Sequence, residues 1–250
     1  MGEWQGKTAV VTGGGRGFGK AFGMALAGES AHAVLVDIDG AVAEEAAAEI
    51  RRRGGSAEGL AGDVTNEERM ADVMARAAKM HGGIDLLINN AGLHSDEYGQ
   101  PITVMGLAKV KRLFDVNVIG TITCTLAAIP HMKGRAGANM INIASSAAHM
   151  HGSAYGDTKL AVAGLTITFA RELAPDGIRV NAISPGLMLT ETIAAELPPE
   201  TKARVKAMQM LEQDGQERHI VDAMMFLTSP RAEFITGETL RVTGGMAAGV

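Results

Sequence analysis

Cysteine and aromatic residues are scarce in this sequence, and an excess of positive charge is absent. Its 250 residues include one cysteine, one tryptophan and two tyrosines. Because Cys124 has no second cysteine to pair with, an internal disulfide is excluded. The N-terminus lacks the basic region and apolar core of a secretory signal, and no apolar run approaches the roughly 18 residues that cross a bilayer. We therefore expect a cytoplasmic protein without a membrane segment.

The charge balance is acidic. Lys and Arg number 23 against 28 Asp and Glu, which gives a formal net charge of -5 and a pI near 5.8. A nucleic-acid-binding protein typically carries a basic patch. The one basic run, Arg51–Arg53, is better explained as the C-terminal end of a helix, where cations interact favourably with the helix dipole. We expect no nucleic-acid partner.

Short β-branched runs alternate with longer Ala-rich segments of helical pattern. The runs are apolar throughout, which is typical of strands buried on both faces of a parallel sheet. This alternation predicts a doubly wound α/β fold, with a parallel sheet of about seven strands and helices on both faces, in three layers. No linker or repeat divides the 250 residues, so a single domain is expected. The runs cover residues 8–12, 33–37, 84–89, 139–144 and 178–184.

Two segments depart from this alternation. Residues 186–216 begin at the end of "SPG", contain "ELPPE" and are rich in Met and charge, which favours a mobile flap with one or two short helices over a site. Residues 160–170 form a helical stretch that is apolar on nearly every side. Such a helix is either buried deep in the monomer or part of an oligomer interface. The interface is favoured, because helices on the outer layer of a sheet have little else to cover them.

A glycine-rich loop, "TGGGRGFG", joins the first strand to the next helix. Gly13, Gly17 and Gly19 allow a tight turn and a close approach to a pyrophosphate, which the free N–H groups of the helix start would bind. Asp37 ends the second strand, where its carboxylate can accept hydrogen bonds from the adenosine ribose and repel a 2′-phosphate. Arg16, inside the loop, could instead pair with a 2′-phosphate. Asp37 holds the discriminating position, so NAD is predicted over NADP.

Tyr155 and Lys159 stand four residues apart in "YGDTK". On a helix these positions share a face, so both side chains can enter one site. A nearby ammonium favours the ionised phenol and is expected to lower the pKa of Tyr155 from about 10 toward neutral pH. Tyr155 is thus a candidate general acid or base.

Several motifs, taken in order, resemble those of the short-chain dehydrogenase/reductase family in its compact single-domain form. The resemblance runs from Thr8 to about Gly245 and implies a Rossmann-type NAD(P)-binding domain, with a homotetramer as the family's habit. The motifs are "TGGGRGFG", Asp63 with Val64, "NNAG" at 89–92, "FDVNVIG" with Asn117, Ser145 and Ser146, "YGDTK", "SPG" at 184–186 and "ITGETLRVTGG" near the end.

The resemblance also implies roles for single residues. Tyr155 would transfer the proton, Lys159 would lower its pKa and hold the nicotinamide ribose, and Asn117 would support a water relay to Lys159. A serine would hydrogen-bond the substrate oxygen. Met188, through its backbone, and Thr190, through its hydroxyl, would anchor the nicotinamide carboxamide. The other implied cofactor positions are Gly13, Arg16, Gly17, Phe18 and Gly19 in the loop, Asp37, Asp63 and Val64 around the adenosine, and Asn90, Ala91 and Gly92 along the cleft.

The substrate serine has two candidates. Ser145 lies ten residues and Ser146 nine residues before Tyr155, so the intervening loop is about three residues shorter than is usual in the family. The position relative to "NI" on the preceding strand favours Ser145, with Ser146 as the alternative. A shorter loop is expected to open or reshape that wall of the substrate pocket.

The predicted function is NAD-dependent interconversion of a secondary alcohol and a ketone, with Tyr155 as general acid or base. The alternative is a nucleotide sensor or scaffold that keeps the fold without the chemistry. A serine hydrolase would need G-x-S-x-G, and "GSAYG" has the wrong spacing. His149 and His151 could ligate a metal, but no Cys or carboxylate lies close in sequence, so a pocket wall is favoured and no metal is predicted. The polar stretch 93–100 is either part of the pocket rim or a solvated loop.

Overall fold

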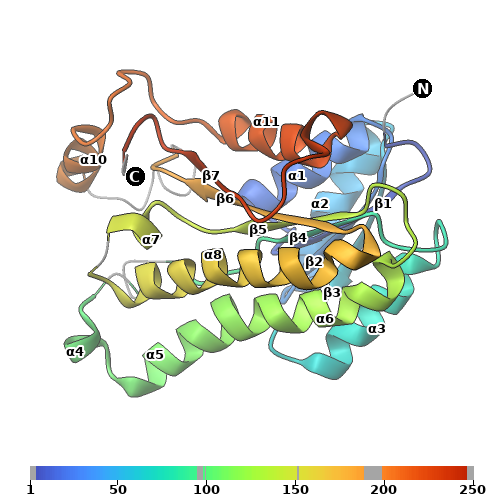
Figure 1. Cartoon of the computed structure of the whole chain (residues 1–250), viewed down its shortest axis with the longest axis horizontal. Helices are drawn as coiled ribbons and strands as arrows, with labels where there is room; N and C mark the ends of the chain where they lie inside the picture. The colour runs from blue at the N-terminus through green and yellow to red at the C-terminus, as the bar shows by residue number, and fades with distance from the viewer. Residues whose placement is uncertain (1–3, 95–97, 99, 151, 189–198, 247–250) are drawn as a thin grey trace.

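A seven-stranded sheet forms the centre of the computed structural model, which describes residues 4–94, 98, 100–150, 152–188 and 199–246 (Figure 1). The strand order is β3-β2-β1-β4-β5-β6-β7, and every neighbouring pair is parallel. The predicted doubly wound α/β fold is confirmed. The strands are β1 (Thr8–Thr12), β2 (His32–Asp37), β3 (Ser56–Ala61), β4 (Leu86–Asn89), β5 (Asn139–Ile143), β6 (Arg179–Pro185) and β7 (Thr239–Val242).

Helices cover both faces of the sheet and complete the three layers. One face carries α1 (Gly17–Gly28), α2 (Gly40–Arg52) and α11 (Glu217–Thr228), and the other carries α3 (Glu67–Ala78), α6 (Gly120–Met132) and α8 (Ala154–Leu173). The connections contain α4 (Ile102–Met105), α5 (Leu107–Phe114), the π-helical turn η2 (Asp115–Ile119), α7 (Ala147–Met150), η3 (Ala174–Asp176), α10 (Pro199–Lys206) and η4 (Pro230–Ala232).

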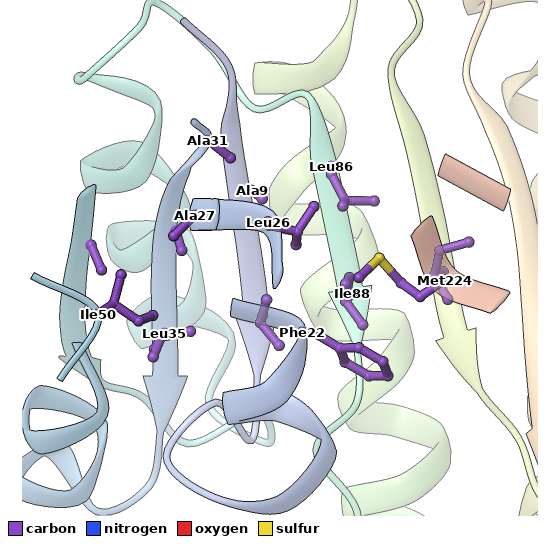
Figure 2. Packing of buried hydrophobic residues seen from close by; sticks show 14 of the residues in the cluster. Ala9, Phe22, Leu26, Ala27, Ala31, Leu35, Ile50, Leu86, Ile88 and Met224 are labelled. Carbon is purple, nitrogen blue, oxygen red and sulfur yellow. The ribbon is translucent and has the colours of Figure 1, made fainter. Parts of the chain in front are cut away.

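Two hydrophobic clusters, one on each face, hold the helices to the sheet. Successive strand residues point to opposite faces, so Val11 joins the cluster under α1 while its neighbour Val10 joins the cluster under α3 and α6. Figure 2 shows the first cluster, in which Phe22 and Leu26 of α1 lie over the sheet and Met224 of α11 reaches toward Ile88. Burial of β1, β2, β4 and β5 along their whole length explains why their sequences are continuously apolar.

One long helical stretch departs from the sequence-based expectation. The run from Leu107 to Met132, through α5, η2 and α6, is long and apolar enough to cross a membrane, with a mean hydropathy of 1.5, and it is the one such helix among the described residues. Core helices meet the same criterion. Here Cys124, Ala128 and Met132 are buried in the cluster on the α6 face. Length and composition are therefore weak evidence for a membrane span.

The apolar helix at 160–170 lies within α8, on the outer layer. Val162 and Phe169 are buried against the sheet, but Leu160 (46% exposed) and Ile167 (53%) point away from it. The alternative of deep burial within the monomer is therefore wrong. The exposed apolar face is left without cover from the described residues.

Candidate active site

Tyr155 and Lys159 occupy the first turns of α8, as their spacing predicts. Ser153 caps this helix by accepting the N–H of Gly156 at 3.0 Å. Lys159 is almost fully buried, and its Nζ donates a hydrogen bond to the carbonyl of Ile143 at 2.7 Å, at the end of β5. The same Nζ lies 5.8 Å from the centre of the Tyr155 ring. The phenol and the ammonium thus belong to one site at the carboxyl edge of the sheet.

Burial moves both pKa values, and for Tyr155 the direction is opposite to the sequence-based expectation. Desolvation lowers the pKa of Lys159 to about 8. Desolvation also raises the pKa of Tyr155, and a hydrogen bond with Ser145 only partly offsets this. The expectation of a lowered Tyr155 pKa is therefore wrong for the chain alone, because the loss of water around the phenol is the largest effect on this pKa.

The two candidate serines have different surroundings. Ser145 makes the hydrogen bond to Tyr155, and its Oγ also accepts the N–H of Ala147 at 3.2 Å. Ser146 is buried, and its N–H donates to the carbonyl of Pro185 at 2.8 Å, which ties β5 to β6. The structure therefore brings Ser145, rather than Ser146, to Tyr155.

The shortened loop after Ser145 folds into the single turn of α7, which packs directly on the start of α8. A Cβ atom on Gly156 would lie only 2.6 Å from the carbonyl oxygen of Ala147, so the close approach requires glycine at this position. His149 is half-buried on α7, while His151 lies outside the described residues. Within the part of the chain that the structure describes, no group of three or more His, Cys, Asp or Glu gathers as a metal site would need.

Asn117 lies in η2 and is fully buried. Its Oδ1 accepts the N–H of Leu93 at 2.7 Å, and its Nδ2 donates to the Leu93 carbonyl and to Thr158 Oγ1, each at 3.1 Å. Thr158 in turn donates to the carbonyl of Tyr155 at 2.7 Å. The Asn117 side chain thus joins the strand end after β4 to the turn of α8 that carries Tyr155 and Thr158. A water relay from Asn117 to Lys159 stays a prediction.

The glycine-rich turn is packed so closely that it leaves no room for a side chain at Gly13 or Gly19. A Cβ on Gly19 would come within 2.0 Å of the Gly13 carbonyl oxygen, and Gly13 itself has a φ of 60°. No side chain among the described residues caps α1, and its first turn has no acidic residue, so its N–H groups are available to an anion. Arg16 is exposed at the start of this helix, whereas the Phe18 ring packs on the core 6.3 Å from the ring of Phe22.

Thr12 fixes the cleft beside this turn and was not among the predicted residues. Its Oγ1 accepts the N–H groups of Asn90 and Ala91, each at 3.1 Å, and Asn90 Nδ2 donates back to the Thr12 carbonyl at 2.9 Å. A Cβ on Gly92 would lie 3.4 Å from Lys159 Nζ, so the "NNAG" segment runs from the glycine turn to Lys159. The only sequence signal for Thr12 is its place directly before Gly13.

Asp37 is buried at the end of β2, and the backbone fixes its carboxylate. Oδ2 accepts the N–H of Gly15 and Oδ1 accepts the N–H of Asp39, both at 3.2 Å. Arg16 makes no ion pair with Asp37 or any other described residue. A pocket of about 400 Å³ opens beside Asp63 and Ile38, between the ends of β2 and β3 and the α5–η2 helix. Val64 is buried behind it.

The predicted flap is described only in part. Met188 is buried and pairs with Gly215 in an isolated bridge, and α10 is one short helix of the kind expected for residues 186–216. A second pocket of about 240 Å³ lies between Leu187, Gly215 and α10. Thr190 lies outside the described residues, so its predicted contact with a nicotinamide stays a prediction, as does mobility of the flap.

Known proteins resemble the chain over nearly its full length. Residues 13–247 match the family model described as enoyl-(acyl carrier protein) reductase. A protein described as a short-chain type dehydrogenase/reductase of Bradyrhizobium diazoefficiens is 35% identical, over 100% of this chain and 90% of the relative. The 7alpha-hydroxysteroid dehydrogenase of Escherichia coli is 31% identical (96% and 94% covered), and the cis-4-hydroxycyclohexanecarboxylate dehydrogenase of Sinomonas cyclohexanicum is 32% identical (97% and 97%).

Two solved structures that share the fold hold nicotinamide dinucleotides. A Haemophilus influenza protein described as a D-mannonate oxidoreductase, with bound NAD, has a TM-score of 0.91 at 25% identity, over 98% of this chain and 96% of that one. A blue fluorescent protein from a metagenomic library, in complex with NADPH, has a TM-score of 0.87 at 29% identity, with 98% and 99% covered. With the family match and the curated relatives, these show that the chain belongs to the short-chain dehydrogenase/reductase family of oxidoreductases.

Proposed function

We propose that this protein is an NAD-dependent oxidoreductase that interconverts a secondary alcohol and a ketone, with Tyr155 as general acid or base. The observation that carries the proposal is the meeting of Ser145, Tyr155 and the buried Lys159 in one site. Two relatives add support, because a hydroxysteroid and a hydroxycyclohexanecarboxylate are both alcohols whose hydroxyl sits on a ring carbon.

The chain's own geometry fits a nicotinamide dinucleotide. Gly13 and Gly19 let the turn pack tightly on itself and on Asn90 and Ala91, whereas no other part of the chain lies within 4 Å of a Cβ at Gly17, so a pyrophosphate could approach the free N–H groups of α1 there. Asp37 would hold the adenosine ribose and Lys159 the nicotinamide ribose. When bound, the cofactor supplies or accepts the hydride.

The protein supplies orientation and the proton. As a ketone is reduced, negative charge develops on its oxygen, and the hydroxyls of Ser145 and Tyr155 would donate hydrogen bonds to that oxygen. Tyr155 then gives up its proton, and the charge of Lys159 stabilises the phenolate that remains. Alcohol oxidation uses the same groups in reverse.

The preference for NAD rests on Asp37. Its carboxylate is held by two backbone N–H groups, so it cannot turn away from a 2′-phosphate without losing both hydrogen bonds. Calorimetric titration should show tighter binding of NADH than of NADPH, and Asp37→Asn should narrow the difference. Tighter binding of NADPH by the wild type would mean that Arg16 outweighs Asp37.

The role of Tyr155 is tested against the only other tyrosine of the chain. Tyr155→Phe should abolish turnover and leave NADH binding nearly unchanged, while Tyr98→Phe, the matched control, should keep activity. Substantial turnover by Tyr155→Phe would remove the proton-transfer role. A wild type that binds NADH and turns over no alcohol or ketone would favour the sensor or scaffold instead.

We also propose that copies of the chain associate through the outer face of α8 and its neighbour. Leu160 and Ile167 of α8, Ile119 of η2 and Leu126 of α6 are all exposed, and η2 contacts both helices. Exposed apolar side chains on neighbouring elements are typical of a subunit interface. Light scattering after size exclusion should give a dimer or tetramer, and Ile167→Glu should weaken it. A monomeric wild type would contradict the proposal.

A further inference from the structure

The chain leaves β6 beside the strand that leads into the candidate site. β5 and β6 are parallel neighbours, and the N–H of Ser146 donates to the carbonyl of Pro185, the last residue of β6, at 2.8 Å. Ser145, which hydrogen-bonds Tyr155, directly precedes Ser146 in the chain. Residues 186–188 therefore begin at the carboxyl edge of the sheet, next to the site that contains Tyr155.

Met188 packs on the face of the sheet that carries α1. It is 4% exposed and belongs to the hydrophobic cluster under α1 and α11, on which the Phe18 ring also packs. Ligands of open parallel sheets bind in the crevice outside the carboxyl ends of the strands. A dinucleotide that reaches from the first turn of α1 to Lys159 would therefore have its nicotinamide end beside residues 186–188.

Gly215 approaches this segment so closely that a side chain would not fit. Met188 and Gly215 form an isolated parallel bridge. A Cβ atom on Gly215 would lie 2.4 Å from the carbonyl oxygen of Leu187 and 2.7 Å from Met188 Sδ. Because the nearest of these atoms belongs to the backbone, a side chain at position 215 would push the backbone of residues 187–188 and Gly215 apart.

The neighbours of Gly215 tie it to two helices. Asp214 forms an ion pair with Lys206, the last residue of α10, at 2.6 Å. Gln216 caps α11, and its N–H donates to Nδ1 of His219 at 3.0 Å. The bridge to Met188 thus lies between α10 in the flap and α11 over the sheet (Figure 1).

The turn after β7 holds the same part of the flap from below. The N–H of Gly186 donates to the carbonyl of Val242 at 2.9 Å, and the N–H groups of Met210 and Leu211 donate to the carbonyl of Gly244 at 2.8 and 3.0 Å. The segment before Met188 and the segment before Gly215 are therefore hydrogen-bonded to one turn. The contact between Met188 and Gly215 is fixed by the fold on both of its sides.

We propose that Gly215 is a positioning residue for the cofactor. It acts through Leu187 and Met188, because its close approach sets where these two residues lie beside the nicotinamide end of the dinucleotide. The ion pair between Lys206 and Asp214 couples this contact to α10. The proposal rests on the proposed function, since it concerns the cofactor of that site.

The first test compares two ligands that differ at the nicotinamide end. ADP-ribose carries the adenosine, the pyrophosphate and the second ribose of NADH without the nicotinamide ring. In calorimetric titration, Gly215→Ala should weaken NADH binding by about tenfold, since small displacements of positioning groups have effects of this order. It should leave the affinity for ADP-ribose nearly unchanged. Equal weakening of both ligands, or of neither, would overturn the positioning role and leave the NAD-dependent function in place.

A second crowded glycine controls for loss of stability. Gly83 precedes β4 at the opposite edge of the sheet, and a Cβ there would lie 2.7 Å from Arg135 Cδ and 2.9 Å from the carbonyl oxygen of His131. Gly83→Ala should lower the melting temperature and keep wild-type affinity for both ligands. A loss of NADH affinity as large as that of Gly215→Ala would overturn the proposal, because the effect would then follow from stability alone. A wild type that binds neither ligand would contradict the proposed function itself.

The ion pair offers a second variant, at the surface, where a change of charge is compatible with folding. The side chains of Lys206 and Asp214 are 33% and 55% exposed, and Asp214→Asn removes one charge of the pair. The matched control is Asp176→Asn, which makes the same change in the ion pair between Lys133 and Asp176, at 3.0 Å. Lys133 follows α6 and Asp176 lies in η3, so this pair belongs to neither the flap nor the site.

Stopped-flow measurement of NADH release tests the coupling to α10. Release should be about 1.5- to fivefold faster in Asp214→Asn, which is the range that an exposed ion pair contributes, and unchanged in Asp176→Asn. Lys206→Gln should have the same effect, and combining it with Asp214→Asn should add little, because both variants break one interaction. Wild-type release in Asp214→Asn, or equal acceleration in Asp176→Asn, would overturn the coupling.

Discussion

Thr158→Val is the substitution that best tests how the candidate site is held together. Thr158 is fully buried and lies between Tyr155 and Lys159, where valine has nearly the same shape but no hydroxyl. In the wild type its Oγ1 accepts a hydrogen bond from Asn117 Nδ2 at 3.1 Å and donates one to the Tyr155 carbonyl at 2.7 Å. The variant removes both, and the Asn117 amide keeps only its contacts with Leu93.

The structure sets the size of the effect. One buried N–H is left without an acceptor, which costs about 1–3 kcal/mol, and in a chain of this size each kcal/mol lowers the melting temperature by about 2–4 °C. Asn117 positions the strand end that faces Lys159. Part of the same cost, about 1–3 kcal/mol, should therefore appear as weaker stabilisation of the transition state. Every 1.4 kcal/mol lost there corresponds to about tenfold in kcat.

Three measurements check this reasoning, with Thr158→Ser as the control that keeps the hydroxyl. Thr158→Val should lower the melting temperature, reduce kcat more than it raises KM, and speed hydrogen exchange at the Leu93 amide, whose partner is Asn117 Oδ1. Thr158→Ser should restore kcat and exchange close to wild-type values. Wild-type exchange at Leu93 together with wild-type kcat in Thr158→Val would refute a positioning role for Thr158.

Three further predictions concern stability. Burial lowers the Lys159 pKa to about 8, so the unfolded state binds the proton more tightly between pH 8 and 10.5; the stability advantage of Lys159→Met over wild type should be largest below pH 8 and shrink as pH rises. Burial and the neighbouring His81 lower the His32 pKa below 6.5, so the free energy of unfolding should decrease as the pH is lowered below about 6.5. In chemical denaturation, His32→Gln should make the free energy of unfolding depend less on pH in this range. Gly19→Ala, whose Cβ would lie 2.0 Å from a backbone oxygen, should lose NADH binding and melt earlier, whereas Gly28→Ala at the other end of α1, with nothing within 4 Å, should not.

The central strands could be predicted from the sequence because both of their faces are buried, but the edge strands could not. β3, "SAEGLA", has only two buried residues, Ala57 and Leu60, and contains Gly59, where a Cβ would lie 2.4 Å from the Glu44 backbone. Glycine is needed there because α2 approaches the strand closely, and a local sequence pattern does not reveal that approach. β7, with Leu240 and Arg241 exposed, likewise becomes a strand through pairing with β6. Edge strands depend on their neighbours more than on their own composition.

In the candidate site, too, local sequence patterns predicted some features, while others depend on residues distant in the chain. Helical spacing was enough to bring Tyr155 and Lys159 together, and motif order was enough to place Ser145 nearby. The direction of the Tyr155 pKa could not be predicted, because desolvation depends on packing by residues distant in sequence. Thr158 contacts Asn117, which is 41 residues away in the chain, so only the fold reveals this link. Cytoplasmic location, the homotetramer and the absence of a metal stay predictions.

Burial of Lys159 is unfavourable, and it occurs on α8, a helix that also packs into the hydrophobic core. Catalysis as proposed needs a charged Lys159, yet desolvation disfavours that charge, and the hydrogen bond to the Ile143 carbonyl recovers only part of the loss. The C-terminal half of α8 offsets it, because Phe169 and Leu173 pack into the cluster under α6. The unfavourable burial of Lys159 and the stabilising contacts therefore lie on one helix, whose packing holds Tyr155 in surroundings that disfavour charge.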